Sequence, residues 1–252
     1  MNPLSHFDPD DPYPDSDGAP MAENTLQFDW IVKIKENLEI LFSDQPEVFV
    51  AGDLFWYPVP DRRISGPMAP DAMVVFGRPK GPRGSYKQWM EAGVAPQVVF
   101  EVLSPSNSAR DLKDKLDFYQ TYGVDEYYVY DPDANRLEVW LRQDDQLRPM
   151  SHINGWTSPG LGIRFRLDKD SLTIFYPDGR PFLSPVELAR SMQQAEQRAA
   201  QEKKRAEQAA QRAEQAEQRA EQLIQRAEHE GQRAARLAER LRALGIDPDT
   251  TD

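Results

Sequence analysis

The hydrophobic positions in the first third of the chain change from a helical to an extended spacing. Over residues 28–42 they recur at intervals of three and four, which predicts an amphipathic helix that ends before Pro46. Short runs of β-branched and aromatic residues follow at 48–50, 54–57 and 70–76. Such runs are typical of strands, so we expect sheet structure to begin directly after the first helix.

The run 97–103 is almost continuously apolar, a pattern that favours a central strand covered on both faces. Glu101 is the only charged residue in it. Residues 104–107 form a turn of N-cap residue types, which predicts a helix that extends to about Tyr122. Gly123 then stands at the usual C-terminal position of such a helix.

Two more extended runs, at 126–130 and 137–141, predict the next strands. The segments 160–165 and 172–176 predict additional edge structure. The order helix, strands, helix, strands indicates an α/β domain with a mixed central sheet.

The last quarter of the chain is a heptad repeat, in which arginine recurs every seventh residue from Arg205 to Arg240. Alternating steps of four and three from Leu188 to Leu244 give a seam of mostly alanine, with leucine or methionine toward its ends and two glutamates. This pattern predicts a coiled-coil helix over 186–244 that pairs two chains as a homodimer, parallel or antiparallel. A single solvated helix held by internal charge pairs is the alternative, because alanine layers bury little surface.

Composition sets the domain limits and the compartment. Residues 1–24 are rich in proline and aspartate and cannot offset the entropy of ordering, so we expect disorder there and in the tail 245–252. One packed domain is expected over 25–182. The chain has no cysteine, no long apolar run and no leader-like N-terminus, so we expect a cytoplasmic protein without thiolate metal sites or membrane segments.

The acidic net charge of the chain argues against tight binding of nucleic acid. The net charge is −12, with 18 basic and 29 acidic residues before Glu187. Proteins that bind nucleic acid tightly usually carry a basic surface. One local basic segment could contact phosphates. The alternative interpretation is that this segment is a solvated surface loop. Its basic residues are Arg78, Lys80, Arg83 and Lys87.

Three residues could together hydrolyse a phosphodiester with a divalent ion, which requires carboxylates to hold the metal and commonly uses a lysine. Asp71 begins a strand, Glu101 lies in the apolar strand, and Lys115 lies on the following helix. A buried carboxylate needs a metal, a cation or several hydrogen bonds. Each residue also has an interpretation without catalysis. Glu101 could lie on a half-exposed strand, and Asp71 could belong to an ordinary turn. Lys115 could form a surface ion pair with Asp111, four residues before it.

Several motifs together resemble the Uma-two family of restriction-endonuclease-like proteins, over about residues 27–182. They are Pro70-Asp71, Val99-Phe100-Glu101-Val102-Leu103-Ser104-Pro105-Ser106, the series Asp111, Lys115, Tyr119, Tyr122-Gly123-Val124 and Glu126-Tyr127, and the flanking strings Gly52 to Pro58 and Gly155 to Gly162. Family members often carry similar tails that end near a string like 241–248.

The resemblance implies the PD-(D/E)XK nuclease fold, with Asp71 and Glu101 as metal-binding acids. The parent motif has its lysine two residues after the acid, where this chain has Leu103. The resemblance places that lysine on the next helix, at Lys115. It also implies a metal ligand from the carbonyl of Val102.

Three further polar residues, Asp53, Ser104 and Asp111, would surround these groups. The function expected from the resemblance is a DNA endonuclease that uses Mg²⁺ or Mn²⁺. Two other readings stay open: a nuclease-fold protein without useful activity that acts as a coiled-coil adaptor, and an enzyme that acts on RNA or single strands.

Overall fold

The central sheet has six strands in the order β1-β3-β5-β6-β7-β8. These strands are β1 (Val48–Ala51), β3 (Ala72–Phe76), β5 (Val98–Val102), β6 (Glu126–Asp131), β7 (Arg136–Gln143) and β8 (Gln146–Pro149). Strands β5 and β6 are parallel, whereas every other neighbouring pair in this sheet is antiparallel. The prediction of an α/β fold with a mixed central sheet is therefore confirmed.

The parallel pair is connected by helix α2 (Ala109–Tyr122), as a parallel connection requires a crossover. Ser108 begins this helix with a capping box, in which its side chain and that of Asp111 each bond the other residue's backbone. Gly123 ends it in the left-handed conformation, with φ 98°. Because a residue with a side chain adopts this conformation at a cost, glycine stops the helix at this point.

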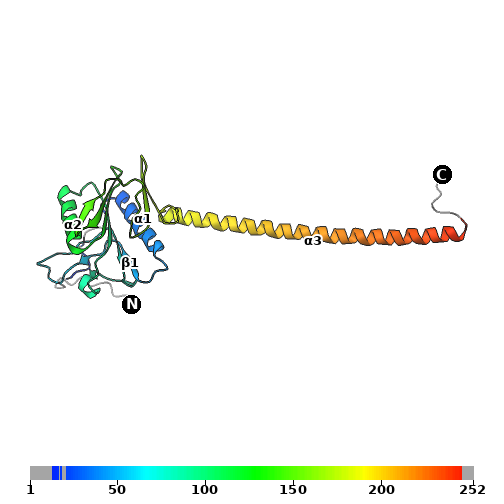
Figure 1. Cartoon of the computed structure of the whole chain (residues 1–252), viewed down its shortest axis with the longest axis horizontal. Coiled ribbons are helices and arrows are strands. Elements are labelled where there is room, and N and C mark those ends of the chain that lie inside the picture. The colour runs from blue at the N-terminus through cyan, green and yellow to red at the C-terminus, as the bar shows by residue number, and fades with distance from the viewer. Residues whose placement is uncertain (1–12, 17, 19–20, 246–252) are drawn as a thin grey trace. The chain divides into compact units, whose positions relative to one another are not determined.

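The computed structural model describes residues 13–16, 18 and 21–245, and the chain divides into the units Met1–Leu188 and Ala189–Asp252. Most of the expected disorder at 1–24 and 245–252 falls outside the described residues. In the first unit the helices α1 (Thr25–Leu41) and α2 lie on opposite sides of the sheet (Figure 1). Alternate residues of each strand therefore enter two separate hydrophobic cores.

Helix α1 covers one face of the sheet through residues spaced three and four apart, Gln27, Trp30, Ile31, Ile34 and Leu38. The antiparallel pair β9 (Arg164–Leu167) and β10 (Leu172–Phe175) completes this side. The sequence predicts edge structure for these two segments. They instead form a separate two-stranded sheet, because their inward side chains, such as Phe165 and Ile174, pack into the core beneath α1.

On the other face, α2 packs with the short parallel pair β2 (Trp56–Tyr57) and β4 (Tyr86–Lys87), which a 3-10 turn, η1 (Gln88–Met90), follows. Trp56 stacks on Tyr119 of α2, with ring centroids 6.2 Å apart and planes 4° apart. The sequence predicts β2 but neither β4 nor β8, both of which are short and carry little apolar periodicity. The candidate chemistry lies on this α2 side.

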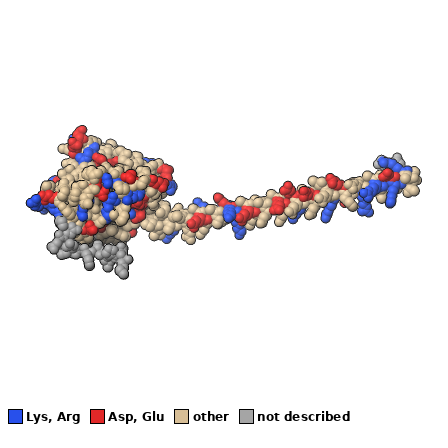
Figure 2. Space-filling view, turned by 90° about the horizontal axis from the view of Figure 1, so that it is seen from below, with Lys and Arg blue, Asp and Glu red and all other residues tan. Residues whose placement is uncertain are grey.

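Helix α3 (Pro185–Ala243) has 59 residues and covers most of the predicted coiled-coil segment. It has no buried residue, and side chains of both charges are interspersed along it (Figure 2). Among the described residues, no helix is both long enough and apolar enough to cross a membrane.

Candidate active site

Glu101 lies within the central strand β5 on the face covered by α2, and only 2% of its surface is exposed. Both of its carboxylate oxygens are bonded by side chains of α2. Lys115 Nζ lies 2.5 Å from Oε2, and the hydroxyl of Tyr119 donates to Oε1. Lys115 and Tyr119 are four residues apart, so one helix face presents both donors to one carboxylate.

Asp71 lies directly beside Glu101 in the sheet. The antiparallel register pairs Ala72 of β3 with Phe100 of β5, and one step further it brings Asp71 opposite Glu101. The Asp71 Oδ2 atom accepts a 2.6 Å hydrogen bond from the backbone N–H of Val102. Thus two carboxylates and the Val102 peptide meet at one end of β5.

Burial and the neighbouring Glu101 carboxylate raise the pKa of Asp71 well above its ordinary value. Lys115 and the Val102 N–H act in the opposite direction, but they do not outweigh desolvation and like-charge repulsion. The site therefore has unfavourable negative charge, which an added cation would relieve.

Lys115 stays protonated in this environment. Burial alone would lower its pKa, but the Glu101 carboxylate, with smaller effects of Asp71 and Asp111, raises it above the ordinary value. A lysine with a raised pKa cannot accept a proton at neutral pH. It can only donate hydrogen bonds and provide positive charge.

The carbonyl of Val102, expected as a backbone metal ligand, already has a partner. The side-chain amide of Gln27 donates to it at 2.9 Å, and the Gln27 Oε1 atom accepts the N–H of Glu23. A carbonyl oxygen has two lone pairs, so one remains for a cation. Sequence reasoning missed Gln27, although a glutamine on the apolar face of α1 was a signal for it.

Tyr119 was also not predicted as a site residue. It is completely buried, and the Glu101 carboxylate adds to the effect of burial in raising its pKa well above the ordinary value. A phenol with this pKa stays a hydrogen-bond donor. Its position four residues after Lys115 on the same helix face could have indicated this role.

The three residues expected around the metal ligands have different surroundings. Asp53 is exposed, but its charge contributes to the raised pKa of Asp71, so it lies near the acidic pair. Ser104 donates instead to Glu23, at 2.7 Å. Asp111 accepts from the N–H and hydroxyl of Ser108 at 2.9 and 2.7 Å, so it is part of the capping box of α2. Of the three, only Asp53 and Asp111 act electrostatically on Asp71 or Lys115.

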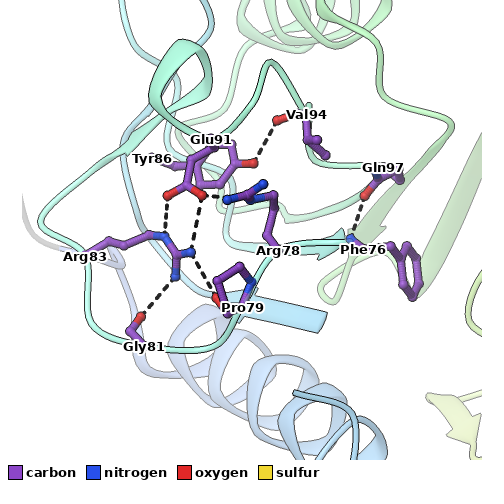
Figure 3. A network of polar contacts seen from close by, with 9 residues as sticks. All are labelled: Phe76, Arg78, Pro79, Gly81, Arg83, Tyr86, Glu91, Val94 and Gln97. Atoms are coloured by element: carbon purple, nitrogen blue, oxygen red, sulfur yellow. Dashed lines mark hydrogen bonds and ion pairs between the residues drawn. The ribbon is translucent and has the colours of Figure 1, made fainter. Parts of the chain in front are cut away.

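Figure 3 shows two of the predicted phosphate contacts, Arg78 and Arg83, on a single carboxylate. Glu91 accepts from Nε of Arg78 at 2.9 Å and from Nε of Arg83 at 2.7 Å. Arg83 also donates to the carbonyls of Pro79 and Gly81, so it holds this loop together. The phosphate role of both arginines stays a prediction.

The two lysines of the predicted basic segment also have partners within the chain. Lys80 bonds Glu39 of α1 at 2.8 Å. The ammonium of Lys87 lies 5.3 Å from the ring centre of Tyr13. A phosphate would have to compete with these contacts.

The donors of the site suit a hard divalent cation. The described residues contain no group of three or more His, Cys, Asp or Glu side chains that could hold a metal. The acidic pair and the Val102 carbonyl offer oxygen atoms only, the donors that Mg²⁺ and Mn²⁺ prefer. Mg²⁺ keeps several waters and is commonly held by one or two carboxylates, so this smaller set fits it.

Comparison with known proteins found similarity to a protein family and to solved structures. A family model, Uma2, described as "Putative restriction endonuclease", matches residues 20–174. Among solved structures, a "putative nuclease belonging to DUF820" from Anabaena variabilis is similar at 15% identity and a TM-score of 0.41, over 56% of this chain and 74% of that chain. The search of curated proteins found no similar sequence.

Proposed function

Because the chain belongs to the Uma2 family of restriction-endonuclease-like proteins, we propose that it is a metal-dependent endonuclease that hydrolyses DNA. One observation carries the proposal: the ammonium of Lys115 lies 2.5 Å from Glu101, which the sheet register brings beside Asp71. Hydrolysis of a phosphodiester with a divalent ion requires carboxylates to hold the metal and commonly uses a lysine, and this site offers two buried acids and a lysine.

Mg²⁺ or Mn²⁺ would be held by Asp71, Glu101 and the carbonyl of Val102. When bound, the ion supplies Lewis acidity toward a phosphate oxygen and lowers the pKa of a bound water. Tyr119 fixes the orientation of Glu101 through its second oxygen. Gln27 does the same for the Val102 carbonyl.

Lys115 stabilises charge in this mechanism. It is an ammonium held beside a carboxylate, so it can donate to an attacking water or to the phosphate oxygen on which negative charge develops. It does not act as a base, because its pKa is raised. This displaced lysine replaces the one that the parent motif has at the position of Leu103.

One observation favours a second function, that of an adaptor without nuclease activity. Both oxygens of Glu101 are bonded by Lys115 and Tyr119, so the chain itself satisfies this buried charge. In that case the coiled-coil helix would be the functional element. The net charge of −12 agrees with weak nucleic-acid binding.

We also propose that α3 joins two chains into a homodimer. The helix has no buried residue, and Leu223 and Leu237 on its seam are 65% and 59% exposed. A second copy of the same seam would cover them. Two nuclease domains in one assembly could then cut both strands of a duplex.

The test compares Lys115→Met with Lys113→Met. Lys113 lies on the same helix but pairs with the exposed Asp117, at 3.0 Å, so its loss controls for charge and helix stability. We expect the Lys115 variant to lose plasmid nicking about 100- to 1,000-fold in Mg²⁺ and to keep metal binding, and the Lys113 variant to keep both. Calorimetric titration with Mg²⁺ or Mn²⁺ gives the binding constant.

Glu101→Gln completes the experiment. It keeps the size of the side chain but removes the charge, so both metal binding and nicking should disappear. Glu126→Gln is the control, because Glu126 is an equally buried carboxylate whose partners, Tyr128, Ser158 and Gly160, lie outside the site. Nicking retained in Glu101→Gln, or no metal binding by the unmodified chain, would favour the adaptor.

A further inference from the structure

A short acidic segment near the N-terminus, Tyr13–Ser16, lies on a face formed by Tyr57, Lys87 and Trp89. We call the segment the strap and the three residues beneath it the aromatic-basic face. The hydroxyl of Tyr13 donates to the carbonyl of Pro60, and the hydroxyl of Tyr57 donates to the carbonyl of Pro14, both at 2.7 Å. Two hydrogen bonds therefore hold the strap on the domain. The prediction of disorder for 1–24 did not anticipate these contacts.

The ring of Tyr13 lies among two aromatic side chains and a cation. Its centre is 5.4 Å from the ring of Tyr57, edge to face, and 5.2 Å from the ring of Trp89. The ammonium of Lys87 lies 5.3 Å from the same ring. Aromatic side chains interleaved with cations are how proteins bind the bases of a single nucleic-acid strand.

The strap also carries negative charge onto a locally basic part of the chain. The side chain of Asp15 lies so close to Gly84 that a Cβ atom on that glycine would be 2.0 Å from its Oδ2. Residues 60–91 contain six Lys and Arg against three Asp and Glu, although the whole chain is acidic. Residues 1–17 contain five aspartates and no Lys or Arg.

The face is connected to the candidate site through one residue. Tyr57 and Lys87 are paired in the short parallel sheet, and the preceding residue of that strand, Trp56, stacks on Tyr119. Tyr119 in turn donates to Glu101. Trp56 thus joins the strand that carries Tyr57 to the residue that bonds Glu101.

We propose that the aromatic-basic face binds a single strand of the nucleic-acid substrate, and that the strap occupies this face in competition with it. Tyr13 takes the place of a base and Asp15 the place of a phosphate. The inference rests on the proposed function for its substrate, but it concerns binding, which can be measured without cleavage. The duplex would have to be opened, or a single-stranded region supplied, at this point.

The experiment measures binding of a fluorescent single-stranded oligonucleotide by anisotropy, without divalent metal, in a Glu101→Gln background that cannot cut. The double substitution Tyr13→Ala, Asp15→Ala removes the competitor. We expect it to tighten binding at least about fivefold, because one stacked base contributes about 1 kcal/mol or more. Asp170→Ala is the control, since it removes an exposed carboxylate on the opposite side of the sheet.

Two further variants make the outcome decisive. Lys87→Ala and Trp89→Ala, each in the strap variant, should return the affinity toward that of the starting protein. No gain on removing the strap, or an equal gain for duplex and single strand, overturns the proposal. If binding behaves as expected while the protein with Glu101 restored cuts nothing in Mg²⁺, the nuclease assignment fails and the binding face stands.

Discussion

Gln27 in helix α1 donates a 2.9 Å hydrogen bond from its side-chain amide to the carbonyl of Val102, which is 75 residues away in the sequence. The bond is buried, and it connects the first turn of α1 to the end of the strand that carries Glu101. It therefore fixes the direction of a carbonyl that we propose as a metal ligand. Partners of this kind orient the groups that contact a metal directly.

Gln27→Met should weaken metal binding about 10- to 100-fold, because the thioether fills the space of the amide but cannot donate to Val102. Calorimetric titration with Mn²⁺ measures this. Gln97→Met is the matched control, since Gln97 precedes the opposite end of β5 and its amide oxygen accepts the N–H of Phe76. Equal losses in both variants would mean that the effect is general destabilisation.

Tyr119→Phe removes one donor to a buried carboxylate and leaves the ring in place. We expect the free energy of unfolding to fall by about 1.5–3 kcal/mol, the range for a hydrogen bond to a charged group. Urea denaturation measures the change. Activity should fall as well, because Glu101 loses its fixed orientation.

Tyr128→Phe is the matched control for this prediction. Tyr128 donates to another buried carboxylate, Glu126, at 2.6 Å, so the two variants lose comparable bonds. A similar loss of stability is expected, but metal binding should be unchanged. If Tyr128→Phe weakened metal binding as much as Tyr119→Phe, the orienting role of Tyr119 would be wrong.

The helices and the longer strands of the core were predictable because their signals are local, whereas the short β4 and β8 were not. The apolar run around Glu101, the cap at Ser108 and the stop at Gly123 each follow from a few neighbouring residues. The placement of Lys115 against Glu101 follows from the crossover helix that parallel strands require. The amino-acid sequence placed Lys115 in the site only through the family resemblance, and its contact with Glu101 is seen only in the structure.

The contacts that depend on register and distant packing could not be inferred. Asp71 meets Glu101 only through the register of β3 and β5, and Gln27 meets Val102 through the packing of α1. The basic loop shows the same limit, because the sequence gives its charges but not the carboxylate of Glu91 that takes up two of them. Side-chain partners across the fold remain outside what periodicity can predict.

Asp71→Asn should stabilise the metal-free protein at neutral pH. The folded protein binds a proton at Asp71 more strongly than the unfolded chain, whose carboxyl has the ordinary pKa of 3.8. Stability is therefore lost as pH rises from about that value through the raised pKa. The Asp71→Asn variant has no such loss. Its melting temperature should therefore equal that of the unmodified protein in acid and exceed it increasingly toward neutral pH.

Mg²⁺ should reverse the order of the two melting temperatures, that of the unmodified protein and that of Asp71→Asn. It favours the ionised acid and should raise the melting temperature of the unmodified protein, but not that of Asp71→Asn. Asp125→Asn serves as the control, because burial also raises the pKa of Asp125, which pairs with Arg142 outside the site. Thermal melts from pH 4 to 8, with and without Mg²⁺, measure these shifts. If Mg²⁺ changed the melting temperature of all three proteins equally, the proposed metal site would be wrong.

The arginine row on α3 predicts how two chains would pair. In the heptad frame of the seam, the arginines from Arg205 to Arg240 immediately precede the a positions and occupy g. In an antiparallel pair these rows would face each other, whereas in a parallel pair each row faces the e positions, which include Glu217 and several small or apolar residues. Repulsion between like charges therefore favours the parallel arrangement.

Leu244→Cys tests this orientation in a chain that has no other cysteine. Residue 244 is a d position, so in a parallel pair the two introduced thiols lie at the same level and can form a disulfide. In an antiparallel pair that overlaps along the 59-residue helix they would be tens of ångströms apart, at about 1.5 Å per residue. We therefore expect mild oxidation of Leu244→Cys to give a covalent dimer on a non-reducing gel.

Gln225→Cys, on the outer side of the same helix, is the control for this crosslink. It should give little covalent dimer, because a thiol on the outer side of a coiled coil points away from the partner helix. A non-covalent dimer by light scattering without the Leu244→Cys crosslink would require the antiparallel pair. A monomer in the same measurement would mean that α3 is a single solvated helix, held by its own charge pairs.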